Sequence, residues 1–341
     1  MRAPAFWWQA APSFLAHALR PPSLLYGAVA ARRMNRPGQK AGLPVLCIGN
    51  FTAGGAGKTP TALAVAELLE GAGESPAFLS RGYGGRLPGP VQVEEHHTAR
   101  DVGDEPLLLG RRAPAIVSRD RPAGARLALE IGATVIIMDD GLQNPSLVKD
   151  CAIAVVDGAT GIGNGLPLPS GPLRAPMPAQ WPAVDAVVIV GAGVGGDAVA
   201  AEAERQGKRV FRASLQPYTA AAEALRGQRV LAFAGIGRPE KFFETLRECG
   251  ALVERIIAFP DHHPYSGDDL RGLRKEAEGL GLQAITTEKD LARIASTEVA
   301  EPWSGLMALP VQLCIDDEAG LRKFILRRIE GRRLRPESLS R

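Results

Sequence analysis

The sequence predicts an α/β protein in which a doubly wound, largely parallel sheet is followed by a second, smaller α/β domain. Two observations predict this class. Short apolar runs alternate with helical stretches from residue 45 onward, and the alternation pauses at 217–227 and then resumes. Near-continuous apolar runs are typical of parallel strands covered on both faces. The 341 residues are enough for two such units.

The first series of elements predicts the larger sheet. We expect its strands at residues 45–49, 77–80, 115–118, 134–138, 153–157 and 186–190. We expect its helices at residues 59–69, 122–131 and 197–206. This alternation favours helices on both faces of the sheet. The glycine- and proline-rich stretch 161–182 is too long for a simple connection, so it is either a functional loop, which we favour as a substrate loop, or a disordered one.

The second series predicts the smaller lobe. We expect strands at 229–234, 253–259 and 283–286, and helices at 239–249, 268–280 and from Glu318 onward. We therefore divide the chain into an N-terminal arm at 1–40, a first domain at 41–216 and a smaller α/β lobe at 217–341.

Composition excludes several classes of protein. The 45% hydrophobic and 23% charged residues are typical of a globular protein rather than a disordered one. Four cysteines occur singly, which indicates neither a zinc site nor a disulfide framework and suits a reducing compartment. The net charge of +3, without a basic stripe, argues against a nucleic-acid partner.

A glycine-rich loop connects the first expected strand to the first expected helix. Its sequence is Thr52-Ala53-Gly54-Gly55-Ala56-Gly57-Lys58-Thr59. Glycines let backbone N–H groups close around a phosphate at the positive end of a helix. In such a P-loop Lys58 would reach the β- and γ-phosphates of ATP, and Thr59 would bring its hydroxyl to Mg²⁺. Thr52 replaces the first glycine of the strict pattern, but the strand-loop-helix context predicts a P-loop over the alternative of a chance glycine-rich turn.

Two carboxylates follow the expected strand at 134–138. Asp139 and Asp140 would lie at the carboxyl edge of the sheet, where one of them can hold Mg²⁺ directly or through water. A GTPase is excluded, because Asp139-Asp140-Gly141 has the wrong spacing and Thr287-Glu288-Lys289-Asp290 is not a base-reading motif. A kinase and a hydrolytic ATPase remain.

Seven segments resemble the tetraacyldisaccharide 4'-kinases of lipid A synthesis, in the family's order and over nearly the whole chain. The segments are Gly49 to Pro60, Leu79-Ser80-Arg81-Gly82-Tyr83-Gly84, Val102-Gly103-Asp104-Glu105-Pro106, Asp139-Asp140-Gly141-Leu142-Gln143, Pro169-Ser170-Gly171-Pro172-Leu173-Arg174, Asp261-His262-His263 and Thr286-Thr287-Glu288-Lys289-Asp290. The resemblance implies transfer of the γ-phosphate of ATP, with Mg²⁺, to the 4'-hydroxyl of a tetraacylated glucosamine disaccharide 1-phosphate, giving lipid IVA. The alternative from another class is a P-loop regulatory ATPase or nucleotide-dependent chaperone that acts on a protein partner.

The resemblance also implies catalytic roles. Asp104 would be the general base for the sugar hydroxyl, and His262 from the smaller lobe would orient it. Glu105 would serve the metal shell, together with Thr59 and the aspartates at 139 and 140. Arg121 would point at the transferring phosphate, although Arg119 is close enough to be confused with it. Without the resemblance, residues 103–105 would be a polar turn and His262 a helix-edge residue.

The substrate side is less specific. Arg81, Tyr83 and Gln143 are expected near the site, without assigned contacts. Arg174 would meet either the 1-phosphate of the substrate or the nucleotide. The family usually continues that motif with glutamate, and Ala175 stands here, so any role of that glutamate is absent or moved. No protein partner is implied.

The N-terminal arm is basic, apolar and aromatic. The first acidic residue of the chain is Glu67, and the arm carries Arg2, Arg20, Arg32, Arg33, Arg36, Lys40 and the aromatic residues Phe6, Trp7, Trp8, Phe14 and Tyr26. A bilayer span needs ~20 uninterrupted apolar residues, and Pro21-Pro22 divides the region. We predict an arm that lies on a membrane surface, at the cytoplasmic face of the bacterial inner membrane. The alternatives are packing on the first domain and a signal peptide, which the ATP-dependent domain that follows argues against.

Overall fold

The larger domain is built on a mostly parallel sheet. The computed structural model describes residues 3–9, 11–295 and 303–334. Within them nine strands form one sheet, in the order β13-β8-β7-β6-β1-β5-β2-β4-β3. The strands are β1 (Val45–Gly49), β2 (Pro76–Ser80), β3 (Val91–Gln92), β4 (Ala115–Val117), β5 (Val135–Asp139), β6 (Cys151–Asp157), β7 (Ala186–Val190), β8 (Arg209–Pro217) and β13 (Val311–Ile315). The two edge pairs, β3 with β4 and β13 with β8, are antiparallel, and the other pairs are parallel.

Helices cover both faces of this sheet, as the alternation predicted. The helices are α3 (Lys58–Glu70), α4 (Ala99–Val102), α5 (Asp104–Gly110), α6 (Arg121–Glu130), α7 (Met177–Gln180), η2 (Trp181–Ala183), α8 (Val194–Arg205) and α13 (Glu318–Arg333). One face packs on α6 and α8, and the other packs on α3, α5 and α13. The central strands β1 and β5 are buried along their whole length, which explains their continuous apolar sequence.

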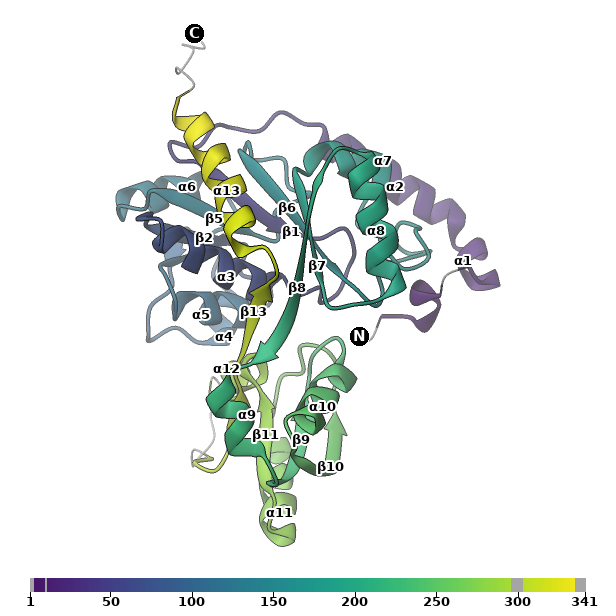
Figure 1. Cartoon of the computed structure of the whole chain (residues 1–341), viewed down its shortest axis with the longest axis vertical. Coiled ribbons are helices and arrows are strands. Elements are labelled where there is room, and N and C mark those ends of the chain that lie inside the picture. The colour runs from purple at the N-terminus through teal and green to yellow at the C-terminus, as the bar shows by residue number, and fades with distance from the viewer. Residues whose placement is uncertain (1–2, 10, 296–302, 335–341) are drawn as a thin grey trace.

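The smaller lobe has its own four-stranded sheet, in the order β10-β9-β11-β12 (Figure 1). Its elements are α9 (Thr219–Leu225), β9 (Arg229–Ala234), α10 (Pro239–Glu248), β10 (Leu252–Ala258), α11 (Gly267–Leu280), β11 (Gln283–Thr287), α12 (Glu288–Ala295) and β12 (Met307–Leu309). Helices α9 and α10 pack on one face, and α11 and α12 pack on the other.

The expected boundary at 217–341 is wrong at its C-terminal end. Strand β13 pairs with β8 in the large sheet, and α13 packs on the large domain beside α3. Thus the chain leaves the larger domain through β8 and returns to it through β13. The pattern analysis missed both strands, because their half-exposed residues lack the continuous apolar character of the central strands.

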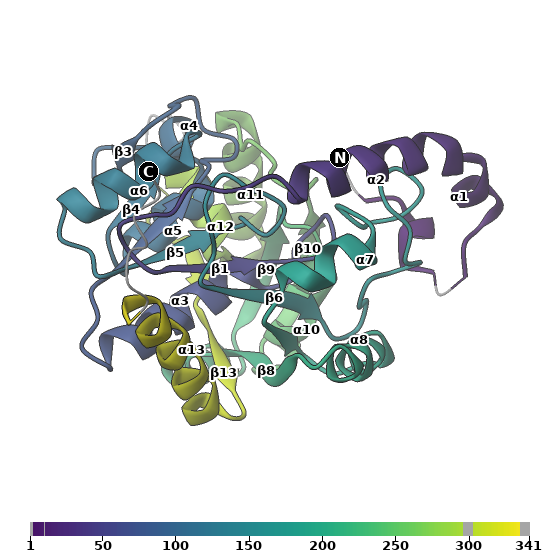
Figure 2. The same ribbon diagram turned by 90° about the horizontal axis from the view of Figure 1, so that it is seen from above.

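The N-terminal arm forms short helices that extend along one side of the larger domain (Figure 2). They are η1 (Ala5–Trp8), α1 (Phe14–Ala18) and α2 (Arg20–Met34). Pro21 and Pro22 lie in the first turn of α2, where a missing N–H costs little. The arm contacts the 161–182 stretch: Trp7 Nε1 donates to the Pro169 carbonyl at 3.0 Å, and Ser23 Oγ donates to that of Pro167 at 2.7 Å. Arg2 lies outside the described residues.

Candidate active site

The glycine-rich loop has the predicted context. Strand β1 ends at Gly49, and α3 begins at Lys58. Gly57, directly before the helix, has φ of 92°, a conformation that favours glycine. The first N–H groups of α3 have no partners within the helix, so they are available to an anion. The strand, the loop and the helix thus follow one another as they do in a phosphate-binding loop.

The 161–182 stretch supports this loop. The Ala53 N–H donates to the Pro172 carbonyl at 2.7 Å, and Arg174 Nε donates to the Thr52 carbonyl at 3.0 Å. The stretch is folded, so the alternative of a disordered segment is wrong. It holds the P-loop on one side and the N-terminal arm on the other. Its expected role as a substrate loop stays a prediction.

Asp139 and Thr59 present buried polar atoms that could hold a cation. Both carboxylate oxygens of Asp139 and the hydroxyl of Thr59 are buried, with no hydrogen-bond partner among the described residues. Burial, with the negative charges of Glu105 and Asp140, raises the pKa of Asp139 to about 7. Leaving such groups unpaired costs roughly 1–3 kcal/mol each, and more for a charge. A hard cation between Thr59 and Asp139 would remove this penalty, so the residues present fit Mg²⁺. The described residues hold no cluster of three or more His, Cys, Asp or Glu side chains arranged for a metal, so phosphate oxygens or water would complete the shell.

Asp140 is instead occupied by cations. Arg174 Nη1 lies 2.7 Å from Asp140 Oδ1, and Lys58 Nζ lies 3.8 Å from the same oxygen. Burial acts to raise the pKa of Asp140, but the charges of Lys58 and Arg174 outweigh it and lower that pKa. These contacts join Arg174 to the P-loop, and its two expected roles, toward the 1-phosphate of the substrate or toward the nucleotide, both stay predictions. Ala175 is fully buried, so no side chain at that position reaches the site.

Asp104 and Glu105 lie where the two lobes meet. They begin α5, and Gly103 before them has φ of 92°. A Cβ on Gly103 would lie 2.5 Å from the Tyr83 carbonyl oxygen, so only glycine fits. His262 Nδ1 lies 3.4 Å from Asp104 Oδ2, and Lys289 Nζ lies 2.7 Å from Glu105 Oε1. The structure therefore brings together the two residues that the resemblance paired.

The charge state of this pair follows from its surroundings. Burial acts to raise the pKa of Asp104, but the hydrogen bond with His262 and the charges of Arg293 and Lys289 hold that pKa well below its ordinary range. The hydrogen bond with Asp104 in turn raises the pKa of His262. The positive charge of Lys289 lowers the pKa of Glu105 against the effect of burial. Glu105 thus forms an ion pair with Lys289 of the smaller lobe. Its expected place in the metal shell stays a prediction.

The structure separates the two candidate arginines. Arg121 opens α6 and is 2% exposed, and its guanidinium donates to the carbonyls of Ser118 at 3.0 Å and Asp139 at 3.5 Å. Arg119 is exposed, and its Nη2 lies 3.5 Å from the Gly85 carbonyl. Burial lowers the pKa of Arg121, and the nearby carboxylate of Asp139 opposes this effect. Arg121 is therefore the one beside the expected metal ligand.

The three remaining candidates have different environments. Tyr83 is 71% exposed, and its ring meets the His262 ring edge to face with centroids 5.7 Å apart. Gln143 is held away from this place, because its Nε2 donates to the Asn50 carbonyl at 2.8 Å and to Gln180 at 2.7 Å. These contacts join Gln143 to the backbone just before the P-loop, and its expected place near the site stays a prediction. Arg81 is exposed on the loop that carries Tyr83.

Sequence reasoning missed several interlobe contacts, among them two that involve arginines. Arg293 on α12 forms an ion pair with Asp104 at 2.6 Å, and Arg238 forms one with Asp157 at the end of β6. No motif marks either arginine. The only signal was the segment 286–290, which was noted as part of the resemblance without a role.

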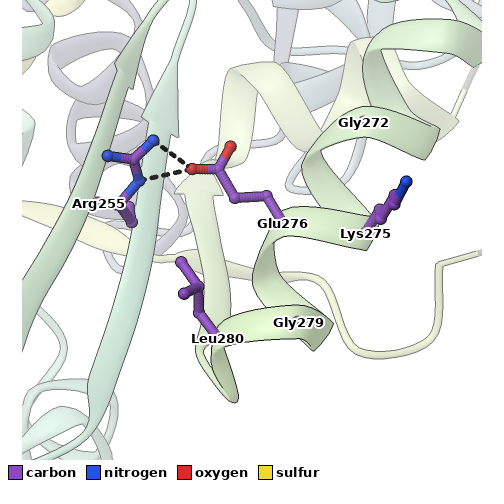
Figure 3. A pocket seen from close by; sticks show the side chains of 6 residues that line it. All are labelled: Arg255, Gly272, Lys275, Glu276, Gly279 and Leu280. Carbon is purple, nitrogen blue, oxygen red and sulfur yellow. Dashed lines mark hydrogen bonds and ion pairs between the residues drawn. The ribbon is translucent and has the colours of Figure 1, made fainter.

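The smaller lobe also has a surface hollow (Figure 3). It has a volume of about 660 Å³ and lies between β10 and α11, where Arg255 and Glu276 form an ion pair. None of its lining residues belongs to the P-loop or to the acidic residues described above. It is not part of the candidate active site.

Comparison with known proteins gives one consistent family. The family described as Tetraacyldisaccharide-1-P 4'-kinase matches residues 15–330. Tetraacyldisaccharide 4'-kinase of Methylobacterium nodulans is 60% identical over 92% of this chain and 91% of its own length. The tetraacyldisaccharide 4'-kinase of Methylobacterium radiotolerans is 57% identical over 95% of this chain and 98% of its own length. The crystal structure of LpxK from Aquifex aeolicus in complex with ATP is similar over 93% of this chain and 100% of its own, at 26% identity and a TM-score of 0.73.

Proposed function

This chain belongs to the tetraacyldisaccharide-1-P 4'-kinase family, and we infer that it transfers the γ-phosphate of ATP to the 4'-hydroxyl of a tetraacylated glucosamine disaccharide 1-phosphate, giving lipid IVA. The protein is a kinase. The alternative of a regulatory ATPase or a chaperone is not favoured, because the relatives are kinases over nearly the full chain. The ATP complex of the Aquifex structure supports ATP as the phosphate donor.

The observation that carries a phosphotransfer role is the pairing of Asp104 with His262 at the interlobe contact. A sugar hydroxyl is a poor nucleophile, and a carboxylate that accepts its proton typically gives about 10²–10⁴-fold in rate. A simple ATP hydrolase needs no such base for an alcohol. Asp104 would accept the proton at its carboxylate, and His262 would orient Asp104 and share the proton.

Lys58, Arg121 and Arg174 would carry the phosphate charges. Lys58 lies at the N-terminus of α3, and Arg174 is joined to the same loop through Thr52. Positive groups fixed around a transferring phosphate stabilise its transition state without reorganising. Thr59 and Asp139 would hold Mg²⁺, which supplies charge neutralisation for the β- and γ-phosphate oxygens. The paired state of Asp140 makes it a support for Lys58 and Arg174.

The arm would bring the enzyme to its acylated substrate at the membrane. Phe14, Leu24, Leu25 and Val29 are 89%, 71%, 71% and 60% exposed, respectively. Exposed apolar side chains beside arginines favour binding in the plane of an anionic lipid surface. None of the described helices combines the length and the apolar character of a bilayer span. We infer a peripheral protein at the cytoplasmic face of the inner membrane, where ATP is present.

Labelled ATP tests the kinase function directly. The protein is incubated with [γ-³²P]ATP, Mg²⁺ and the tetraacylated disaccharide 1-phosphate in detergent micelles, and the lipid is then separated by chromatography. We expect label in the lipid, at a rate that depends on the concentration of added lipid. Label released only as inorganic phosphate, regardless of the lipid, would contradict the proposal and favour the regulatory ATPase.

A further inference from the structure

Arg293 is a buried cation that the smaller lobe inserts against the catalytic carboxylate. It lies on α12, which follows directly from β11, and its side chain is 8% exposed. Helix α12 packs against α5, the helix that begins with Asp104. Burial of an arginine costs free energy of folding unless its N–H groups are paired, so the contacts of Arg293 indicate its role.

Its guanidinium connects three parts of the interlobe contact. Nε and Nη2 lie 2.8 and 2.6 Å from Asp104 Oδ2, and Nη1 donates to the Gly235 carbonyl at 2.8 Å. Nη1 also lies 2.8 Å from Asp290 Oδ1, a buried carboxylate that in turn accepts from the Gly235 N–H at 3.1 Å. The guanidinium of Arg293 is therefore fixed within the smaller lobe, by Asp290 of its own helix and by the Gly235 carbonyl, and its other nitrogens contact Asp104 of the larger domain.

His262 is attached to the same framework. Its backbone N–H donates to the Gly235 carbonyl at 3.0 Å, the oxygen that also accepts from Arg293. Its Nδ1 lies 3.4 Å from Asp104 Oδ2 and 3.4 Å from Arg293 Nη2. Gly235 thus sets the spacing between the imidazole and the guanidinium, and both of them meet the same carboxylate oxygen.

This arrangement leaves the two oxygens of Asp104 unequal. Oδ2 receives Arg293 and His262, whereas no hydrogen bond to Oδ1 is found in the described part of the chain. A carboxylate fixed through one oxygen presents the other in a defined direction. A misplacement of about 1 Å in such a group can cost 10²-fold in rate.

We propose that Arg293 is a positioning residue for phosphotransfer, which anchors Asp104 through Oδ2 so that Oδ1 faces the hydroxyl of the acceptor lipid. The inference rests on the proposed role of Asp104 as the general base. Without Arg293, the carboxylate turns toward His262 and away from the acceptor. Binding of ATP at the P-loop does not involve Arg293.

The alternative is a purely structural arginine that only holds the two lobes together. The two roles predict opposite changes at His262, whose ring is faced by Asp104, Asp261, Arg293 and Tyr83. Loss of a positioning arginine lets Asp104 pair more closely with His262 and removes a nearby positive charge, so the imidazole titrates at higher pH. Loss of a structural arginine separates the lobes, so the imidazole titrates closer to the free value of about 6.5.

The test compares Arg293→Gln and Arg293→Lys with the wild type, and uses Arg255→Gln as the control. Arg255 also belongs to the smaller lobe and to an ion pair, but it lies in the remote hollow of Figure 3. We expect Arg293→Gln to lower kcat about 10–100-fold with the KM for ATP changed less than about twofold, and Arg293→Lys to recover part of kcat. NMR of ¹³C-labelled histidine in the full-length protein should show the His262 midpoint moving up in Arg293→Gln. The control should leave kcat, KM and the midpoint unchanged.

Three results would overturn the proposal. They are a wild-type kcat in Arg293→Gln, a His262 midpoint that moves down in Arg293→Gln, and a folded Arg293→Lys protein that recovers none of the lost kcat. If Arg293→Gln does not fold, the proposal is tested by the kcat and the His262 midpoint of Arg293→Lys alone. Failure of the proposed function is distinct, because the wild type would then transfer no label to the lipid.

Discussion

His262 Nδ1 lies 3.4 Å from Asp104 Oδ2, a contact between side chains of different lobes. The carboxylate belongs to the start of α5 in the larger domain, and the imidazole belongs to the loop between β10 and α11 in the smaller one. Because the two residues belong to different lobes, the approach of the lobes assembles the pair, although His262 also lies near Asp261 and Arg293 of its own lobe. The lobes also meet at Glu105 with Lys289 and at Asp157 with Arg238.

We expect Asp104→Ala and His262→Ala each to lower kcat strongly, about 10²-fold or more, with little change in the KM for ATP. The double variant should be scarcely worse than the poorer single variant, because groups that act as one unit are not additive. Steady-state kinetics with the acylated disaccharide measure this. Losses that multiply in the double variant would indicate two independent contributions.

The contact between His262 and Asp104 also predicts a pH dependence of stability. Hydrogen bonding to Asp104 raises the pKa of His262 in the folded protein above the unfolded value of about 6.5. The stabilisation is therefore fully present below that unfolded value and is lost as the pH rises through the folded one. The melting temperature of the wild type should exceed that of His262→Gln more at about pH 5.5 than at about pH 8.5. An equal difference at both pH values would show that the charge of His262 does not stabilise the contact.

Asp139 rather than Asp140 should hold the metal directly. Asp139→Asn should raise the Mg²⁺ concentration needed for half-maximal activity and abolish the Mg²⁺-dependent part of ATP binding, because its oxygens, which have no hydrogen-bond partner among the described residues, are the expected ligands. Asp140→Asn should instead weaken ATP binding with and without Mg²⁺, since it releases Arg174 and Lys58. Calorimetric titration of each variant with ATP, in the presence of Mg²⁺ or of EDTA, distinguishes these two effects. The reverse pattern would assign the metal to Asp140.

Lys58→Ala should lower phosphotransfer by about 10²–10³-fold, because a fixed cation at the transferring phosphate is lost. Lys58 is only 9% exposed, but its contact with Asp140 is long at 3.8 Å, so the melting temperature should change little. Lys275→Ala, an exposed lysine on α11, is the matched control. Wild-type turnover in Lys58→Ala would show that this loop is not the phosphate site.

The membrane role of the arm is best tested at its exposed side chains. Deletion of residues 1–20 should reduce binding to anionic vesicles more than binding of ATP, but it also removes Trp7 from the 161–182 stretch. The double change Leu24→Ser and Leu25→Ser avoids this, since both side chains are 71% exposed. We expect less co-sedimentation with phosphatidylglycerol vesicles and unchanged binding of ATP. Leu252→Ser, an exposed position on the smaller lobe, is the control, and unchanged partitioning of the double variant would favour the alternative that the arm serves only to pack on the first domain.

Local sequence was sufficient for the elements that are buried on both faces. The run at 45–49 and the run at 186–190 were predicted to the residue, because a central parallel strand must be apolar throughout. The P-loop was predictable for a similar reason, since its glycines, Lys58 and Thr59 are neighbours in the chain. The family was also evident, because its motifs occur in order along the sequence, and the comparisons confirm it.

Only the tertiary structure decided how distant charges are shared. The sequence suggested that Asp104 and His262 act together, but it gave no indication that Arg293 contacts the same oxygen or that Lys289 neutralises Glu105. It also left Asp139 and Asp140 equivalent, whereas folding surrounds Asp140 with cations and leaves the oxygens of Asp139 without a hydrogen-bond partner in the described part of the chain. The physical reason is that the spacing of apolar residues along the sequence indicates which face of each helix or strand is buried. The partner of a charge depends instead on which elements the fold brings within a few ångströms.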